Sequence, residues 1–283
     1  MKKLLFLFPL VFLLAACGRE PESIQTEEAS GVETLPRVVA SNYPLWFFAN
    51  EIAAGSIDVV LPEIEGDPAM WRPGSEGIEL LQSADRILLN GAGYESWLNW
   101  ISLPANRLVD TSTPILDRLI PLEKETVHQH GPDGEHSHTG YAFTLWLDPE
   151  LAIAQAQAVA AVLDQLAPEH SQQHQENLSS LQQRLENLHT RQQQAFSSLA
   201  GQPVLFSHPV YQYLERQYGL QGNSVHWEPD QAPSDKAWID FANKIRNHPA
   251  RLMLWEDEPL PAVRSRLESM ELVVIPYLTA SNR

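Results

Sequence analysis

The segment over residues 168–199 is the feature that most limits how this chain can fold. It contains no glycine, it is rich in Gln, Glu and Ser, and its leucines recur at Leu178, Leu181, Leu185 and Leu188. Steps of three and four residues place these leucines in one narrow stripe of a helix. At about 1.5 Å per residue such a helix is roughly 45 Å long. We therefore expect one long rigid helix that divides the rest of the chain into two parts.

Two histidines of this helix, His170 and His174, lie four residues apart. That spacing places both on one side of a helix and suits a pair of metal ligands. An exposed polar face explains them better, and it is the interpretation we adopt. We also take His189 and His248 as surface residues.

Short apolar runs alternate with helix-length stretches on both sides of this helix. The expected strands before it are residues 37–43, 57–62, 86–91 and 106–110, with helices over 44–54, 75–84 and 94–101. The expected strands after it are residues 203–208, 224–227, 251–256 and 271–276, with helices over 210–220, 235–245 and 262–270. Such alternation produces parallel sheets covered on both faces. The fold class is therefore α/β, with two doubly wound α/β lobes, one over 37–167 and one over 200–283.

The first 17 residues read as a secretory signal rather than as part of the fold. Lys2 and Lys3 precede an apolar run, and Ala15 and Ala16 lead into Cys17, the only cysteine of the chain. The apolar run is too short for a stable membrane span. Leu-Ala-Ala-Cys resembles the bacterial lipobox, which predicts a lipid on Cys17; an ordinary cleavable signal is the alternative. Residues 18–36 are polar and read as a flexible tether, so we expect an extracytoplasmic protein anchored to a bacterial membrane, either in the periplasm or at the cell surface.

The charge of the chain excludes some partners. The formal net charge is −17, and removal of the two signal lysines makes it about −19. Such a surface repels nucleic acid and attracts cations, although acidity also serves solubility alone. We expect no nucleic-acid partner.

Ligands of open α/β sheets collect beyond the carboxyl ends of the strands. The polar side chains that follow the expected strands are Tyr43, Asn90, His208, Glu228, Glu256, Asp257 and Glu258. One imidazole and several carboxylates would thus face a cleft. His226 lies beside Glu228, but a histidine at a strand end is more often structural than a ligand.

A histidine-rich loop lies before the second half of the chain. Four of the ten histidines, His128, His130, His136 and His138, occur within VHQHGPDGEHSH at residues 127–138. Tracts of this composition commonly bind metals, while a solvated loop that binds them only adventitiously is the alternative. No G-x-S-x-G, H-E-x-x-H, P-loop or dinucleotide-binding fingerprint occurs, so we expect no enzyme.

Five segments together resemble a known family, the zinc and manganese solute-binding lipoproteins of bacterial ABC transporters. They are ASNYPLWFFANEI at 40–52, LPEIEGDPAMWRP at 61–73, IELLQSADRILLNGAGYESWL at 78–98, LWLDP at 145–149 and FSHPVYQYLERQYGL at 206–220. The resemblance covers nearly all of residues 37–276. It implies two α/β lobes bridged by a long helix and an extracytoplasmic role in metal capture.

The resemblance also implies where this chain departs from the family. Two positions that usually carry cleft histidines are Ala69 and Thr144 here, whereas the third is retained as His208. An acid near the last strand is sometimes a fourth ligand, and the tail YLTASNR contains none. Because a methyl group cannot bind zinc and a neutral hydroxyl binds it poorly, the retained histidine needs other partners.

The loop can supply them, since His138 lies six residues before Thr144, a link of at most about 20 Å. We expect a metal site drawn from His128, His130, His136, His138 and His208 with Glu256 or Glu258.

The sequence therefore predicts a monomeric lipoprotein that binds zinc and delivers it to an ABC permease. The sequence also allows another divalent transition metal as the bound ion. A set of ligands that is rich in imidazole and has no thiol suits manganese and calcium poorly. The alternative is a degenerate relative that stores metal as a chaperone, or acts as an interaction or regulatory lipoprotein, without a working cleft site.

Overall fold

A computed structural model describes residues 34–64, 66, 68–122, 140–228, 230–246 and 248–280, and the backbone alone of residues 126–129 and 135–138. The expected signal and lipobox over 1–17, and most of the tether over 18–36, lie outside the described residues. No helix among the described residues is both long enough and apolar enough to cross a membrane.

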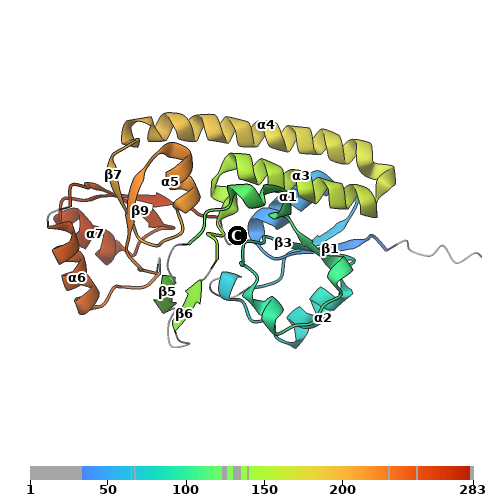
Figure 1. The fold of residues 1–283 in the computed structure, drawn as a ribbon, viewed down its shortest axis with the longest axis horizontal. Coiled ribbons are helices and arrows are strands. Elements are labelled where there is room, and N and C mark those ends of the chain that lie inside the picture. Colours follow the sequence, from blue (N-terminus) through green and yellow to red (C-terminus); the bar gives the residue numbers. More distant parts are fainter. Residues whose placement is uncertain are drawn as a thin grey trace, which may run out of the picture. The chain divides into compact units, whose positions relative to one another are not determined.

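The N-terminal lobe contains a four-stranded parallel sheet in the order β2-β1-β3-β4 (Figure 1). Its strands are β1 (Arg37–Ala40), β2 (Asp58–Val60), β3 (Arg86–Leu89) and β4 (Leu108–Asp110). Val38 and Val39 of the central strand β1 are fully buried and belong to two different hydrophobic clusters. Neighbouring residues of a strand face opposite sides of the sheet, so both faces are covered, as the continuous apolar runs predict.

Two helices of this lobe begin where the sequence predicts. Helix α1 (Tyr43–Ala53) follows Asn42, whose side chain accepts a hydrogen bond from the Leu45 amide at 3.0 Å, and helix α2 (Ser75–Ser83) follows Gly74. The helix expected over residues 94–101 is wrong. That segment forms only a 3-10 turn, Ser96–Asn99, because the Glu95 side chain accepts bonds from the strand end instead. Further 3-10 turns occur at Pro68–Met70, Ala105–Arg107, Thr113–Arg118 and Leu145–Leu147.

The C-terminal lobe repeats the parallel arrangement in the order β10-β9-β7-β8. Its elements are β7 (Pro203–Phe206), α5 (Gln212–Tyr218), β8 (Gln221–Ser224), α6 (Asp235–Ile245), β9 (Leu252–Glu256), α7 (Pro261–Ser269) and β10 (Val273–Tyr277). The strand expected over residues 224–227 is wrong in position, because β8 ends at Ser224. Val225 and Trp227, which suggested a strand, lie past its end and pack into the core of this lobe.

Two antiparallel helices, α3 (Pro149–Leu166) and α4 (Ser171–Phe196), connect the lobes. The expected 168–199 helix is a 3-10 turn, Pro168–His170, then α4, then a second turn, Ser197–Leu199. Leu178 and Leu181 enter the N-terminal core, whereas Leu188 is exposed. The sequence analysis missed α3, although Asp148 at its N-cap and Pro149 in its first turn are ordinary start signals.

The exposed polar face expected around His170 and His174 is wrong for His174. Its ring is fully buried, with Nε2 2.7 Å from Ser56 Oγ and Nδ1 3.0 Å from Asp164 Oδ1. The same side of α4 faces the end of α1, where Asn177 donates to the Ile52 carbonyl at 2.9 Å. The His170 side chain is 49% exposed, as expected for a surface residue.

The histidine-rich loop contains a two-stranded antiparallel ribbon, β5 (Thr126–Gln129) and β6 (Glu135–His138). The root of the loop consists of residues 120–122 and 140–142, which pair with each other. The Leu122 amide donates to the Gly140 carbonyl and the Ala142 amide to the Ile120 carbonyl, both at 2.9 Å. An isolated antiparallel bridge between Pro121 and Tyr141 thus closes the loop at its base.

Candidate metal-binding site

His208 and Glu256 meet at the carboxyl edge of the C-terminal sheet. β7 and β9 are adjacent, with Phe206 opposite Leu254, so residues two positions further along are neighbours as well. The His208 Nδ1 atom lies 3.3 Å from the Glu256 Oε2 atom. Both residues are largely buried, and the Glu256 amide donates to Ser207 Oγ at 2.8 Å. The fold thereby places an imidazole against a carboxylate at the edge where ligands bind.

A chain of hydrogen bonds extends from this pair to the other lobe. Thr279 Oγ1 donates to the second carboxylate oxygen of Glu256 at 3.1 Å, and Trp146 Nε1 donates to the Thr279 carbonyl at 2.6 Å. Thr279 belongs to the tail that the resemblance expects to carry an acid. Here the tail contributes a hydroxyl, and the carboxylate comes from the neighbouring strand.

Ala69 and Thr144, the two positions where the resemblance implies lost cleft histidines, are both buried. Ala69 is 1% exposed, and its carbonyl accepts a hydrogen bond from Ser96 Oγ at 3.2 Å. The Thr144 hydroxyl donates to the Val210 carbonyl at 2.6 Å, two residues after His208. The hydrogen bond that the Thr144 hydroxyl donates therefore connects the two lobes.

The other predicted ligands are placed differently. Glu258 is an exposed carboxylate that accepts a bond from Arg264 Nη2 at 2.6 Å, so it is engaged away from His208. The side chains of His128, His136 and His138, and all of His130, lie outside the described residues. Among the side chains described, which exclude those of residues 123–139, no three His, Cys, Asp or Glu residues are grouped so as to hold a metal ion.

The sequence analysis missed a buried carboxyl group at the edge of the N-terminal sheet. Glu95 accepts hydrogen bonds from Ser41 Oγ and the Asn90 amide at 2.6 Å, and from the Gly91 amide at 3.1 Å. Burial raises the pKa of Glu95 from 4.5 to about 7, although these hydrogen bonds oppose the rise. Glu95 thus joins the ends of β1 and β3. In the sequence, Glu95 is the last residue of NGAGYE, at 90–95, which is part of the segments that carry the resemblance.

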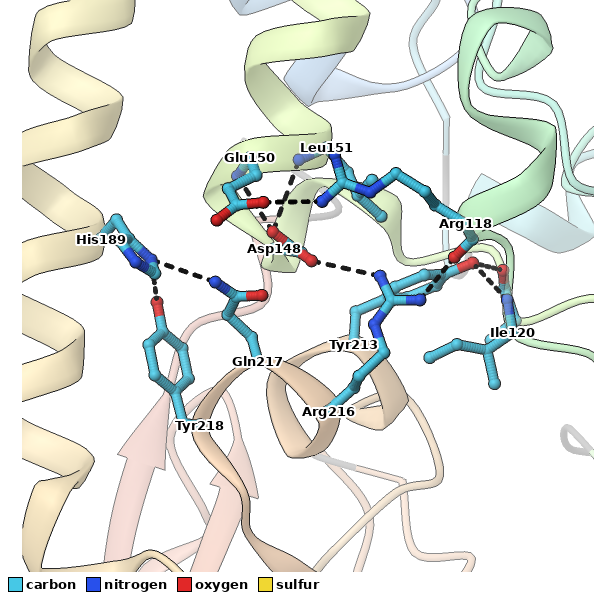
Figure 2. A network of polar contacts seen from close by, with 11 residues as sticks. Arg118, Ile120, Asp148, Glu150, Leu151, His189, Tyr213, Arg216, Gln217 and Tyr218 are labelled. Carbon is cyan, nitrogen blue, oxygen red and sulfur yellow. Dashed lines mark hydrogen bonds and ion pairs between the residues drawn. The ribbon is translucent and has the colours of Figure 1, made fainter.

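A second polar network joins the lobes beside α5 (Figure 2). Arg216 lies 3.2 Å from the Asp148 carboxylate, which also caps α3, and it donates to the Arg118 carbonyl as well. The Tyr213 hydroxyl accepts from the Ile120 amide at 3.2 Å and donates to the Ala142 carbonyl at 2.8 Å. The root of the histidine-rich loop is therefore bonded to the helix that follows His208.

These features define a class: a two-lobed α/β binding protein whose lobes are connected by helices and whose candidate ligands lie at a sheet edge. Residues 38–273 match the family described as periplasmic zinc-uptake complex component A (ZnuA), and the chain belongs to that family. Its members are solute-binding metal carriers, which confirms the expectation that this chain is not an enzyme.

Similar proteins include the zinc-binding lipoprotein AdcA of Streptococcus pneumoniae, 21% identical over 236 residues that cover 81% of this chain and 47% of AdcA. A putative metal-binding protein of Treponema pallidum is 24% identical over 88% of this chain and 79% of its own length. The chain thus spans about half the length of the streptococcal relatives.

Solved structures confirm the expected fold class. The Zn(II)-bound ZnuA-like domain of Streptococcus pneumoniae AdcA superposes with a TM-score of 0.72 at 17% identity, covering 88% of this chain and 89% of that domain. The metal-dependent lipoprotein YcdH of Bacillus subtilis gives a TM-score of 0.71 at 20% identity, with 88% and 89% coverage.

Proposed function

We propose that this protein binds zinc outside the cytoplasm and delivers it to an ABC-type metal permease. The observation that carries the proposal is His208 held against Glu256 at the carboxyl edge, in a chain of the zinc-uptake family. Zinc-binding relatives and a Zn(II)-bound structural neighbour favour zinc among divalent metals. A neutral imidazole is a good zinc ligand, but one histidine does not complete a tetrahedral site.

The remaining ligands are proposed to come from the histidine-rich loop. In its ribbon His128 is opposite His136, and His138 follows two residues later. Three of the four histidines therefore lie at or next to one position of the backbone register of the ribbon. The bonds from Tyr213 to Ile120 and Ala142 hold the root of the loop against α5, the helix that follows His208, and this supports the loop as the source of the remaining ligands.

Deletion of residues 127–139 tests this proposal, because the pairing of Leu122 with Gly140 is retained. Isothermal titration with zinc should show a large loss of affinity, on the order of 100-fold for removal of most ligands. A full-length variant with glutamine at His128, His130, His136 and His138 is the matched control, and it should lose the same affinity. Unchanged zinc affinity in both variants would show that the loop is not part of the site.

Failure of the unaltered protein to retain zinc after dialysis would instead favour the degenerate relative without a working site. The proposed monomeric state is checked by sedimentation of the same samples.

The membrane attachment is proposed from the lipobox. Lipid on Cys17 would tether the two lobes through residues 18–36, close to a permease. Labelled fatty acid should appear on the natural chain and be absent from Cys17→Ser; label on the variant would exclude this anchor.

A further inference from the structure

We propose that Glu256 is a positioning residue for His208 rather than a zinc ligand. This inference rests on the proposed zinc binding. It assigns the metal to the Nε2 atom of His208 and gives the carboxylate the task of holding the other ring nitrogen.

The burial of the ring supports this assignment. His208 Nδ1 is buried and faces Glu256 Oε2 at 3.3 Å, while the whole residue is 8% exposed. Zinc binds an imidazole through one ring nitrogen, at about 2.0 Å. Nε2 is on the opposite edge of the ring from Nδ1, so a metal ion bound at Nε2 would leave the contact between Nδ1 and Glu256 in place.

The second carboxylate oxygen of Glu256 is already engaged. Thr279 Oγ1 donates to Oε1 at 3.1 Å, and the Glu256 amide donates to Ser207 Oγ at 2.8 Å. Trp146 fixes Thr279 in turn through its carbonyl. A carboxylate held in this way has little freedom to turn toward a metal ion, and its other oxygen lies beside Nδ1 at 3.3 Å.

The chemistry of histidine ligands explains why such a carboxylate matters. A histidine that binds zinc usually donates its other ring N–H to a carboxylate or carbonyl, which fixes the tautomer and makes the ligand more basic. The contact at 3.3 Å is an ion-pair contact that does not have hydrogen-bond geometry in this structure. Metal binding at Nε2 makes the Nδ1 proton more acidic and should tighten this contact.

Three variants separate positioning from direct ligation. Glu256→Ala removes the acceptor, Glu256→Gln keeps an oxygen that can accept the Nδ1 proton, and Glu258→Gln is a control at the same strand end. We expect a 10- to 100-fold loss of zinc affinity for Glu256→Ala. Glu256→Gln should lose less than about 10-fold, and Glu258→Gln should stay within about twofold. Equal large losses for Glu256→Ala and Glu256→Gln would overturn the proposal, because a direct ligand needs the charged carboxylate.

The tautomer of His208 gives a readout that needs no metal. In metal-free full-length protein, nitrogen-15 NMR should show the His208 proton on Nδ1, with the signal assigned through His208→Gln. Glu256→Ala should shift the proton toward Nε2, whereas Glu256→Gln and Glu258→Gln should leave it on Nδ1. A tautomer that is unchanged in Glu256→Ala would overturn the positioning role. If the natural protein binds no zinc, the proposed function fails, while the tautomer measurement still decides the role of Glu256.

Thr279→Val is a milder second variant, since it removes the hydroxyl that holds Glu256 and keeps the shape of the side chain. It should reduce zinc affinity by a few-fold and weaken the Nδ1 preference. Unchanged affinity and tautomer would show that Glu256 needs no such support and would overturn that part of the proposal.

Discussion

At the scale of single residues, Glu95 shows how burial and hydrogen bonding compete at one carboxyl group. Two main-chain amides and one hydroxyl stabilise its ionised form, yet desolvation dominates and brings its pKa to about 7. The folded state therefore holds a proton on Glu95 between about pH 4.5 and pH 7, where the unfolded chain has released it. A protein that binds more protons when folded loses stability as the pH rises through this window.

We predict that the pH dependence of stability changes in Glu95→Gln. The stabilising effect of Glu95 is fully present below about pH 4.5, and it falls as the pH rises to about 7, by about 3 kcal/mol at most. The glutamine variant cannot ionise, so its unfolding free energy relative to the natural protein should increase between pH 5 and pH 7.5. Urea denaturation at several pH values measures this difference. A constant difference across that range would contradict the burial of an ionisable group, and exposed Glu79→Gln is the control.

At the scale of elements, β8 depends on close contact between its backbone and the layer beneath it. A Cβ atom on Gly222 would lie 2.0 Å from Phe206 Cε2 and 2.1 Å from Glu215 Oε1. Phe206 is fully buried, and burial raises the pKa of Glu215 to about 7. The Phe206 ring is packed in the core and cannot move away easily, which explains why glycine occupies this position of the edge strand QGNS.

Gly222→Ala should therefore destabilise the protein by about 2 to 3 kcal/mol, as overpacking of a filled layer does. Gly74→Ala is the matched control, because no atom lies within 4 Å of its added Cβ and its φ is −74°. Thermal unfolding followed by circular dichroism compares the two variants. Equal melting temperatures would mean that the layer under β8 is not tightly packed.

At the scale of the whole molecule, Asp148 stabilises one element and joins two lobes. It is fully buried, it accepts bonds from the Glu150 amide at 3.0 Å and the Leu151 amide at 3.4 Å, and its other oxygen faces Arg216 (Figure 2). Helix α4 adds a further connection, because Gln192 donates to the Tyr277 hydroxyl at 2.7 Å while His174 is buried against Asp164. Contacts of this kind make cooperative unfolding of both lobes the expected behaviour.

We predict that Asp148→Ala lowers the unfolding free energy by about 2 to 3 kcal/mol, since it removes a helix cap and leaves Arg216 without its carboxylate. Asp148→Asn retains the capping oxygen and should cost clearly less. Hydrogen exchange of peptides from β1 and β7 reports on each lobe, and we expect their protection to separate in Asp148→Ala. Equal costs for both variants would show that the charge, and not the cap, is what matters at this position.

Local patterns explain what the sequence determined by itself. Short apolar runs, helical apolar spacing, helix starts at Pro44 and Ser75, and the long helix that contains α4 all depend on neighbours in the chain. They predicted two α/β lobes, and the order of strands and polar residues placed His208 at a ligand edge. The tertiary structure decided what depends on distant residues. It buried His174 against Ser56, ended β8 at Ser224, and set Glu256 rather than Glu258 beside His208. A side chain's burial and partners arise from packing between segments far apart in the chain, and spacing along one segment does not contain that information.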